Sequence, residues 1–349
     1  MELVQREESR LIDRGFGYDR RMPELSDIID RVLEVPVVPS FTKIGYAVRS
    51  RLDDWTDLDD SDLHGRIYVV TGSTSGLGRY TAEQLASRGA AVIVNGRDHD
   101  KTARIRDEIV AATGSEQISI VAGDMGELDQ VKTMAADLAS RFPTIHGLLH
   151  NAGALANERQ ENSDGIEATV ASQVVGPFLL TSLLLDRLRA AAPGRVVTMS
   201  SGGMYTAGLT VNGLQMSESE YGGSEQYARA KRAQVTLNEM WAQRVPSNEV
   251  VFHAMHPGWA DTPGVEASLP TFRKIVGPLL RSSEQGADTM VWLAADDGEP
   301  TSSTGEFWLD RRTRSIHKVG KTRTADTPER RAELWNWVVD QSGADVAEW

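Results

Sequence analysis

The stretch Thr71-Gly-Ser-Thr-Ser-Gly-Leu-Gly78 decides the fold of this chain. It follows an apolar run typical of a strand and precedes a segment with helical periodicity. The glycines Gly72, Gly76 and Gly78 allow a tight turn and a close approach to an anion, and the helix start presents unpaired N–H groups. A plain tight turn is the alternative, because three glycines alone are a weak signal. The position of the turn at the first strand–helix junction favours binding of a dinucleotide pyrophosphate.

The surrounding sequence places this turn in a parallel sheet. From about residue 65 to residue 312, apolar strands alternate with amphipathic helices, as in a sheet that helices cover on both faces. We therefore predict an α/β fold with a single doubly wound Rossmann domain over residues 65–312 and a mainly parallel, seven-stranded sheet. The predicted strands are Arg66–Thr71, Ala91–Asn95, Ile118–Gly123, Gly147–His150, Arg195–Ser200, Val250–His256 and Gly305–Leu309. The main predicted helices are Asp100–Ala112, Leu128–Arg141 and Ile166–Ala191.

Two flanking regions differ from this pattern. Residues 1–64 form an N-terminal extension that is broken by prolines and ends in an aspartate-rich run over residues 53–62, which we interpret as a solvated linker. Residues 313–349 form a tail that is polar until Pro328 and then closes with a predicted helix, Glu329–Gln341.

The N-terminal extension contains a short amphipathic segment of its own. Ser26 is placed to cap a helix that runs to Leu33, and the apolar side chains after it are flanked by Lys43, Arg49 and Arg51. Such a segment can lie on a membrane surface, pack on a second subunit or cover the chain's own core. Core packing or an oligomer contact is the expected outcome.

Composition excludes several classes of protein. The chain has 349 residues and a net charge of −13, which argues against nucleic acid as the main partner. It has no cysteine, so disulfides, thiolate metal sites and a cysteine nucleophile are excluded. No N-terminal signal region or spanning apolar stretch is visible, and we expect a cytoplasmic protein. The seven histidines include no HExxH or similar ligand set, and we predict no metal site.

The end of the second predicted strand indicates which dinucleotide binds. An acidic residue there would hold the ribose 2′-OH of NAD, but this chain has Asn95-Gly96-Arg97. The guanidinium of Arg97 can bind a 2′-phosphate bidentately, which favours NADP(H) over NAD(H). Asp98 follows directly and either weakens this positive field or starts the next helix.

Tyr227 and Lys231 form a candidate proton-transfer pair. Their i, i+4 spacing puts both on one helix face, where the ammonium group would favour phenolate and lower the tyrosine pKa. Such a tyrosine can exchange a proton with a carbonyl oxygen near neutral pH. The alternative is a half-buried aromatic side chain on a helix. Tyr221 is a weaker candidate because Glu225 occupies its i+4 position.

These motifs together resemble a known family. Thr71–Gly78, Asn151-Ala-Gly153, Ser200-Ser201, Tyr227-x-x-x-Lys231 and Pro257-Gly258 occur in the order found in short-chain dehydrogenases/reductases, and the resemblance covers about residues 64–312. The stretch Met255–Val265, with Ser200–Met204 and Gln285–Met290, is similar to the branch called dehydrogenase/reductase member 12.

The resemblance implies roles for individual residues. Tyr227 would be the general acid in reduction, Lys231 would lower its pKa and hold the nicotinamide ribose, and Ser201 would hydrogen-bond the substrate oxygen. A homodimer or homotetramer would be the usual assembly. The implied cofactor contacts are Gly72, Ser73, Ser75, Gly76, Leu77, Gly78, Arg97, Asp124, Met125, Asn151, Ala152, Gly153, Tyr227, Lys231, Pro257 and Gly258.

One position departs from the family pattern. The family usually has asparagine in the long helix before the fifth strand, where it supports a proton relay to the lysine, and this chain has Gln173. Pro177 lacks an N–H, so in a helix it frees the carbonyl four residues back, which is that of Gln173. We therefore hypothesise that the relay operates through the Gln173 carbonyl, whatever its side chain.

The predicted activity is the interconversion of a carbonyl and an alcohol with NADP(H). The segment Trp259–Ser283 should form the substrate loop, and its apolar side chains either contact a hydrophobic substrate or pack onto the core. A second hypothesis is an NADPH-binding regulatory or scaffold protein with little turnover, motivated by Gln173 and the N-terminal segment. A third is a related lyase or epimerase that uses Tyr227 as a base.

Overall fold

The computed structural model describes residues 25–34, 36–55, 58 and 61–346. A single sheet runs through the centre in the order β3-β2-β1-β4-β5-β6-β7-β8. The first seven strands are parallel, and β8 pairs antiparallel with β7. The strands are β1 (Ile67–Val70), β2 (Ala91–Gly96), β3 (Ile118–Ala122), β4 (Gly147–His150), β5 (Gly194–Met199), β6 (Val250–Met255), β7 (Phe307–Leu309) and β8 (Arg312–Thr313). The predicted doubly wound α/β fold is confirmed.

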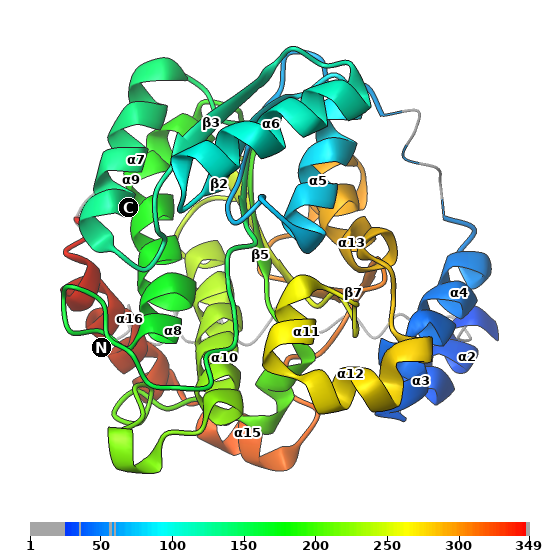
Figure 1. The fold of residues 1–349 in the computed structure, drawn as a ribbon. Coiled ribbons are helices and arrows are strands. Elements are labelled where there is room, and N and C mark those ends of the chain that lie inside the picture. The colour runs from blue at the N-terminus through cyan, green and yellow to red at the C-terminus, as the bar shows by residue number, and fades with distance from the viewer. Residues whose placement is uncertain (1–24, 35, 56–57, 59–60, 347–349) are drawn as a thin grey trace, which may run out of the picture.

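Helices cover both faces of the sheet (Figure 1). Successive strand residues point to opposite faces, so Val69 and Leu148 join one apolar cluster while Val70 and Leu149 join the other. One face is covered by α5 (Gly76–Ser87), α6 (His99–Thr113) and α13 (Ser283–Ala295). The other face is covered by α7 (Leu128–Arg141), α9 (Gly176–Arg189), α10 (Gly223–Ala242) and α16 (Pro328–Ser342).

Shorter helices connect and flank these layers. The N-terminal segment contains α2 (Leu25–Glu34), α3 (Val37–Phe41) and α4 (Lys43–Leu52). The segment after β6 contains α11 (Pro263–Ser268), α12 (Pro270–Val276) and the 3₁₀ turn Gly277–Leu279. The remaining short elements are α8 (Ala168–Val170), α14 (Glu299–Ser302), α15 (Gly320–Ala325) and the 3₁₀ turns Gly202–Thr206 and Glu218–Glu220.

The strand number differs from the prediction by one, because a short hairpin follows β7. Its two loop residues, Asp310 and Arg311, have φ values of 55° and 52°. Two-residue hairpin loops of this kind usually contain Asn-Gly or Asp-Gly, since a positive φ is costly for other residues. Here the Asp310 carboxylate is ion-paired with Arg49 and Arg281, which holds the turn.

The predicted helix Ile166–Ala191 is interrupted. It consists of α8, a π-helical turn over Ala171–Val175 and α9. Pro177 lies just after the π turn and cannot donate a backbone hydrogen bond, which accounts for a local break at this place.

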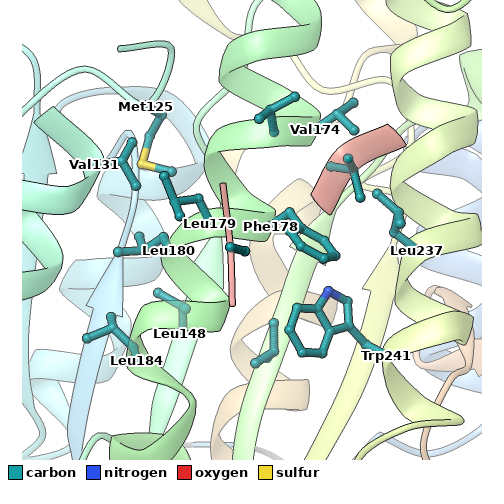
Figure 2. Packing of buried hydrophobic residues seen from close by; sticks show 14 of the residues in the cluster. Met125, Val131, Leu148, Val174, Phe178, Leu179, Leu180, Leu184, Leu237 and Trp241 are labelled. Carbon is teal, nitrogen blue, oxygen red and sulfur yellow. The ribbon is translucent and has the colours of Figure 1, made fainter. Parts of the chain in front are cut away.

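This interrupted helix is the centre of the larger apolar cluster (Figure 2). Phe178 lies 5.1 Å, ring centroid to ring centroid, from both Trp241 of α10 and Trp335 of α16. Within the described residues, Ala168–Arg189 is also the one helical stretch long and apolar enough to cross a membrane, but 78% of its most apolar window is buried inside the protein. It is a core helix.

The N-terminal segment is tied to the sheet by buried ion pairs. Arg49 is fully buried and pairs with Asp30 of α2 and with Asp310, both at 2.7 Å. Asp53, part of the run interpreted as a solvated linker, is ion-paired with Arg312 of β8. These contacts attach the N-terminal segment to the β7–β8 hairpin, at the edge of the sheet.

Candidate active site

The glycine-rich turn has the geometry that a pyrophosphate site requires. Gly72 and Gly76 have φ values of 62° and 56°, which favour glycine. A Cβ on Gly72 would lie 2.7 Å from the Cα of Ala152, and one on Gly78 would collide with the side chain of Asn151. The first turn of α5 has no side-chain cap, so its N–H groups face outward at the end of the sheet. This part of the chain fits a bound dinucleotide.

Two asparagines hold the turn in place. Nδ2 of Asn151 donates to the carbonyls of Thr71 and Gly72 at 3.0 Å each. Oδ1 of Asn95 accepts from the Gly72 N–H at 3.2 Å. The cofactor role predicted for Asn151 therefore includes support of the glycine turn, and Asn95 has a supporting role that the sequence pattern did not reveal.

Ser73 is hydrogen-bonded inside the glycine-rich turn. Its side chain is fully buried, its hydroxyl donates to the Val70 carbonyl at 2.7 Å, and its N–H donates to the Asn95 carbonyl at 2.9 Å. Because both polar groups are hydrogen-bonded within the protein, Ser73 shapes the turn, and its contact with a cofactor stays a prediction. Ser75, in contrast, precedes α5 and makes no capping bond.

Two of the implied cofactor contacts, Arg97 and Asp124, lie together. Nη1 of Arg97 is 3.6 Å from Oδ2 of Asp124, and the Arg97 side chain is 81% exposed. Asp98 is the N-cap of α6, where its carboxylate accepts from the Lys101 N–H at 2.7 Å. The structure therefore assigns Asp98 to starting the helix, and Arg97 remains accessible to an anion. Met125 is buried behind this site.

Tyr227, Lys231 and Ser201 converge at the carboxyl end of β5. Tyr227 and Lys231 lie one turn apart on α10, with Nζ of Lys231 5.3 Å from the centre of the phenol ring. The Ser201 hydroxyl accepts from the Gly203 N–H at 3.2 Å, and a Cβ on Gly203 would contact both the Ser201 hydroxyl and the Tyr227 ring. Nζ of Lys231 donates to the Met199 carbonyl at 2.8 Å.

Desolvation dominates the titration of this pair. Burial raises the pKa of Tyr227 to about 12, although the hydrogen bond with Ser201 acts in the opposite direction. Burial lowers the pKa of Lys231 to about 7. Among the protein's own groups, the phenol is therefore held in its protonated form, opposite to the expected stabilisation of phenolate by the lysine. A protonated phenol suits donation to an oxyanion.

The Gln173 carbonyl lies outside the α-helical ladder, as Pro177 predicts, but it has a partner. It accepts a 2.6 Å hydrogen bond from Nε2 of Gln234 on α10. Nε2 of Gln173 donates to the Ala154 carbonyl at 2.7 Å, and the same side chain lies against Gly153. Gln234, three residues after Lys231, was not among the predicted site residues.

Pro257 and Gly258 are positioned by a buried arginine. Gly258 has a φ of 72°, and a Cβ there would collide with the guanidinium of Arg281. Nη1 of Arg281 donates to the Pro257 carbonyl at 3.3 Å, and Arg281 also pairs with Asp310. Neither Arg281 nor Asp310 has a local sequence signal, because their roles depend on contacts between distant segments.

Phe41 brings the N-terminal segment to the same end of the sheet. Its carbonyl accepts from the Trp259 N–H at 2.7 Å, and its ring packs edge-on against His256 at 4.3 Å between centroids. A Cβ on Gly202, next to Ser201, would lie 2.7 Å from the Phe41 ring. The N-terminal segment is therefore part of the wall behind the site.

Comparisons with known proteins agree with this geometry. A family model described as short chain dehydrogenase matches residues 66–271. The chain is 37% identical over 278 residues to human dehydrogenase/reductase SDR family member 12, covering 79% of this chain and 86% of that protein. It is 31% identical to human retinol dehydrogenase 12, covering 78% and 85% respectively.

Solved structures share the fold. A Mycobacterium paratuberculosis protein of 26% identity superposes with a TM-score of 0.65 over 83% of this chain and 98% of its own. L-Sorbose reductase from Gluconobacter frateurii, solved with NADPH and L-sorbose, has 21% identity and a TM-score of 0.58 over 71% of this chain and 96% of its own. The chain belongs to the short-chain dehydrogenase/reductase family and is an NAD(P)-dependent oxidoreductase that interconverts carbonyls and alcohols.

Proposed function

We propose that this enzyme is an NADP(H)-dependent reductase of hydrophobic carbonyl compounds, with Tyr227 as general acid. The observation that carries the proposal is the convergence of Tyr227, Ser201 and Lys231 at the end of the sheet where the glycine turn opens. The bound nicotinamide would supply hydride to the carbonyl carbon. An alkoxide forming at the carbonyl oxygen then needs a hydrogen-bond donor and a proton source.

The protein's own groups meet this need. The Ser201 hydroxyl, which lies near Tyr227 beside Gly203, orients the substrate oxygen, and the Tyr227 phenol gives up its proton to that oxygen. Lys231 lies beside the phenol and holds the nicotinamide ribose. The glycine turn, Asn151 and Pro257-Gly258 orient the cofactor between the sheet and the segment after β6.

The preference for NADP(H) rests on Arg97. We expect Arg97→Ala to weaken NADPH binding by about 1.5–3 kcal/mol, or about 10–100-fold, with little change for NADH, because the lost hydrogen bonds are to a charged phosphate. Fluorescence titration with both cofactors measures this. Arg106→Ala is the matched control, since Arg106 is also ion-paired on α6 but distant from the turn. Equal binding of NADH and NADPH by the wild type would disprove the preference.

The substrate class follows from the segment after β6. Trp259 packs edge-on against Phe272 of α12 at 5.1 Å, and the remaining apolar side chains of α11 and α12 are partly or fully exposed. The test is NADPH oxidation across a panel of hydrophobic aldehydes, ketones and quinones, with Tyr227→Phe as the inactive control. Absence of turnover above that control would favour an NADPH-binding regulatory protein instead.

We propose that the proton relay reaches Lys231 through water on the Gln173 carbonyl, which can accept a second hydrogen bond beside the one from Gln234. A cavity of about 30 Å³ lies beside Gln173, Gln234 and His150. Four residues that line it carry a buried polar atom with no hydrogen-bond partner among the described residues: Gln173 Oε1, Gln234 Oε1, Asn238 Oδ1 and His150 Nδ1. The cavity wall is mainly apolar, but its volume is enough for one or about two water molecules where these polar side chains meet it.

This relay predicts a contrast between two variants. Gln173→Ala keeps the backbone carbonyl and should retain most of the wild-type kcat. Pro177→Ala returns an N–H that competes for the same carbonyl, and it should lower kcat more than Gln173→Ala does. Steady-state kinetics with NADPH affinity measured in parallel tests both. A collapse of kcat in Gln173→Ala with intact NADPH binding would show that the side chain carries the relay.

A further inference from the structure

Exposed large apolar side chains are concentrated at one corner of the described structure. Five of the eight come from the N-terminal segment. One exposed apolar residue, Leu183, lies on α9 and not in this region. The full set is Ile28, Val32, Val37, Val38, Ile44, Leu183, Ile275 and Val319. Surface apolar residues scattered singly need no explanation, but a cluster indicates a contact surface.

Helix α2 is oriented with its polar face inward. Asp30 is 3% exposed and pairs with Arg49 and Arg314, while Asp27 and Glu34 pair with Arg312, Arg314 and Lys318. Ile28 and Val32 on the same helix are 47% and 69% exposed. A surface helix of a soluble protein normally buries its apolar stripe. The ion pairs therefore force the apolar stripe of α2 toward the outside.

The apolar surface continues onto the segment after β6. Phe41 of α3 contacts Trp259, and Trp259 contacts Phe272 of α12. Ile275, one turn further along α12, is 76% exposed. Nζ of Lys318 lies 5.3 Å from the centre of the Phe41 ring, which brings the neighbouring Val319 to this corner. Figure 1 shows α2, α3 and α4 gathered at the end of α12. We call this surface, defined by Ile28, Val32, Val37, Val38, Ile44, Ile275 and Val319, the apolar corner.

Free cations accompany the apolar corner although the chain carries a net charge of −13. Arg31, Lys43, Arg51 and Lys274 are exposed, and none forms an ion pair with another described residue. The acidic residues of α2 and Asp53 are already paired with arginine or lysine side chains. Asp54 is the one carboxylate of residues 25–34 and 36–55 outside these pairs, so unpaired cations outnumber unpaired carboxylates among the described residues at the corner.

We propose that the apolar corner docks this enzyme peripherally on an anionic phospholipid bilayer. Apolar side chains enter the interface between head groups and acyl chains, and the surrounding Lys and Arg side chains bind lipid phosphates. A second copy of the chain fits less well, because a two-fold contact opposes the same patch on both copies and would bring identical cations together. The inference goes beyond the proposed reductase activity and does not depend on it.

Co-sedimentation with lipid vesicles tests the proposal on the full-length protein. We expect binding to vesicles of phosphatidylcholine with phosphatidylglycerol, weaker binding to phosphatidylcholine alone, and a loss of binding at high salt. The double variant Val32→Glu/Ile275→Glu should reduce binding about tenfold or more, because two acidic side chains replace apolar contacts. Leu183→Glu is the matched control, since Leu183 is 45% exposed but lies on α9, and it should bind as the wild type does.

A second variant separates the charges from the apolar contacts. Lys43→Glu/Arg51→Glu should abolish the preference for phosphatidylglycerol. NADPH binding, measured for every variant, should stay at the wild-type level and shows that the fold is intact. Unchanged vesicle binding by Val32→Glu/Ile275→Glu would overturn the proposal. The proposal would also be overturned if this variant changed from oligomer to monomer in sedimentation velocity but bound vesicles as the wild type does. That result would identify the apolar corner as an interface between copies of the chain.

Discussion

Tyr227→Phe is expected to lower kcat for carbonyl reduction by about 10²–10⁴-fold, the usual contribution of a positioned general acid. The phenylalanine ring keeps the packing on α10 but cannot donate a proton to the oxygen that Ser201 orients. A phenol is protonated near neutral pH, and burial raises the Tyr227 pKa further, to about 12, so the proton transfers only to a strongly basic alkoxide of the kind that hydride addition forms. NADPH affinity should change little, since the glycine turn and Asn151 are untouched.

Stopped-flow or steady-state NADPH oxidation measures the effect. Tyr221→Phe is the matched control, because its hydroxyl bonds Glu167 and the Ala156 carbonyl and lies outside the proton-transfer group. This control should retain near wild-type kcat. A Tyr227→Phe enzyme with more than a tenth of the wild-type kcat would be incompatible with the proposed role.

Asp310→Asn is expected to destabilise the protein by about 3–5 kcal/mol, because it leaves the buried Arg281 without its ion-pair partner and leaves Arg49 with Asp30 alone. Asp310 is 1% exposed and pairs with both Arg49 and Arg281, which are themselves buried. These arginines hold the Asp310 pKa below its usual value against the opposing effect of burial. NADPH affinity should also fall, because Arg281 supports Pro257 and Gly258.

Urea unfolding followed by tryptophan fluorescence measures the loss as a lower midpoint at unchanged slope. Asp261→Asn provides the comparison, because its ion pair with Arg273 is exposed and worth about 1 kcal/mol or less. Equal midpoints for Asp310→Asn and the wild type would show that the buried pairs do not hold the N-terminal segment to the sheet.

Local patterns predicted most of the fold. Alternating strands and helices identified all seven parallel strands, and α7 begins and ends at the predicted residues, Leu128 and Arg141. The patterns missed β8, because Leu309-Asp310-Arg311-Arg312 lacks the residues that normally form a two-residue hairpin. They also missed the π turn, although Pro177 correctly indicated a disturbed ladder at Gln173.

The candidate site was predictable where its residues act through local geometry. The glycines need positive φ or close backbone approach, and Tyr227 and Lys231 need only one helical turn between them. Gln234, Arg281 and Phe41 were not predicted, because each acts through a partner far away in the sequence. The hydrogen bonds of Ser73 with Val70 and Asn95 were not predicted either, because they form only when the turn packs against the second strand.

The sequence by itself determined the parallel sheet, the glycine turn, the position of Arg97 at the end of the second strand and the spacing of Tyr227 and Lys231. These features follow from periodicity and backbone freedom within a few residues. Only the tertiary structure decided that burial raises the Tyr227 pKa and that α2 turns its acidic face inward. Both depend on desolvation and on ion pairs between distant segments, such as Arg49 and Asp310, which are 261 residues apart in the chain. No local pattern encodes such partners, because the contacts exist only after the sheet has assembled.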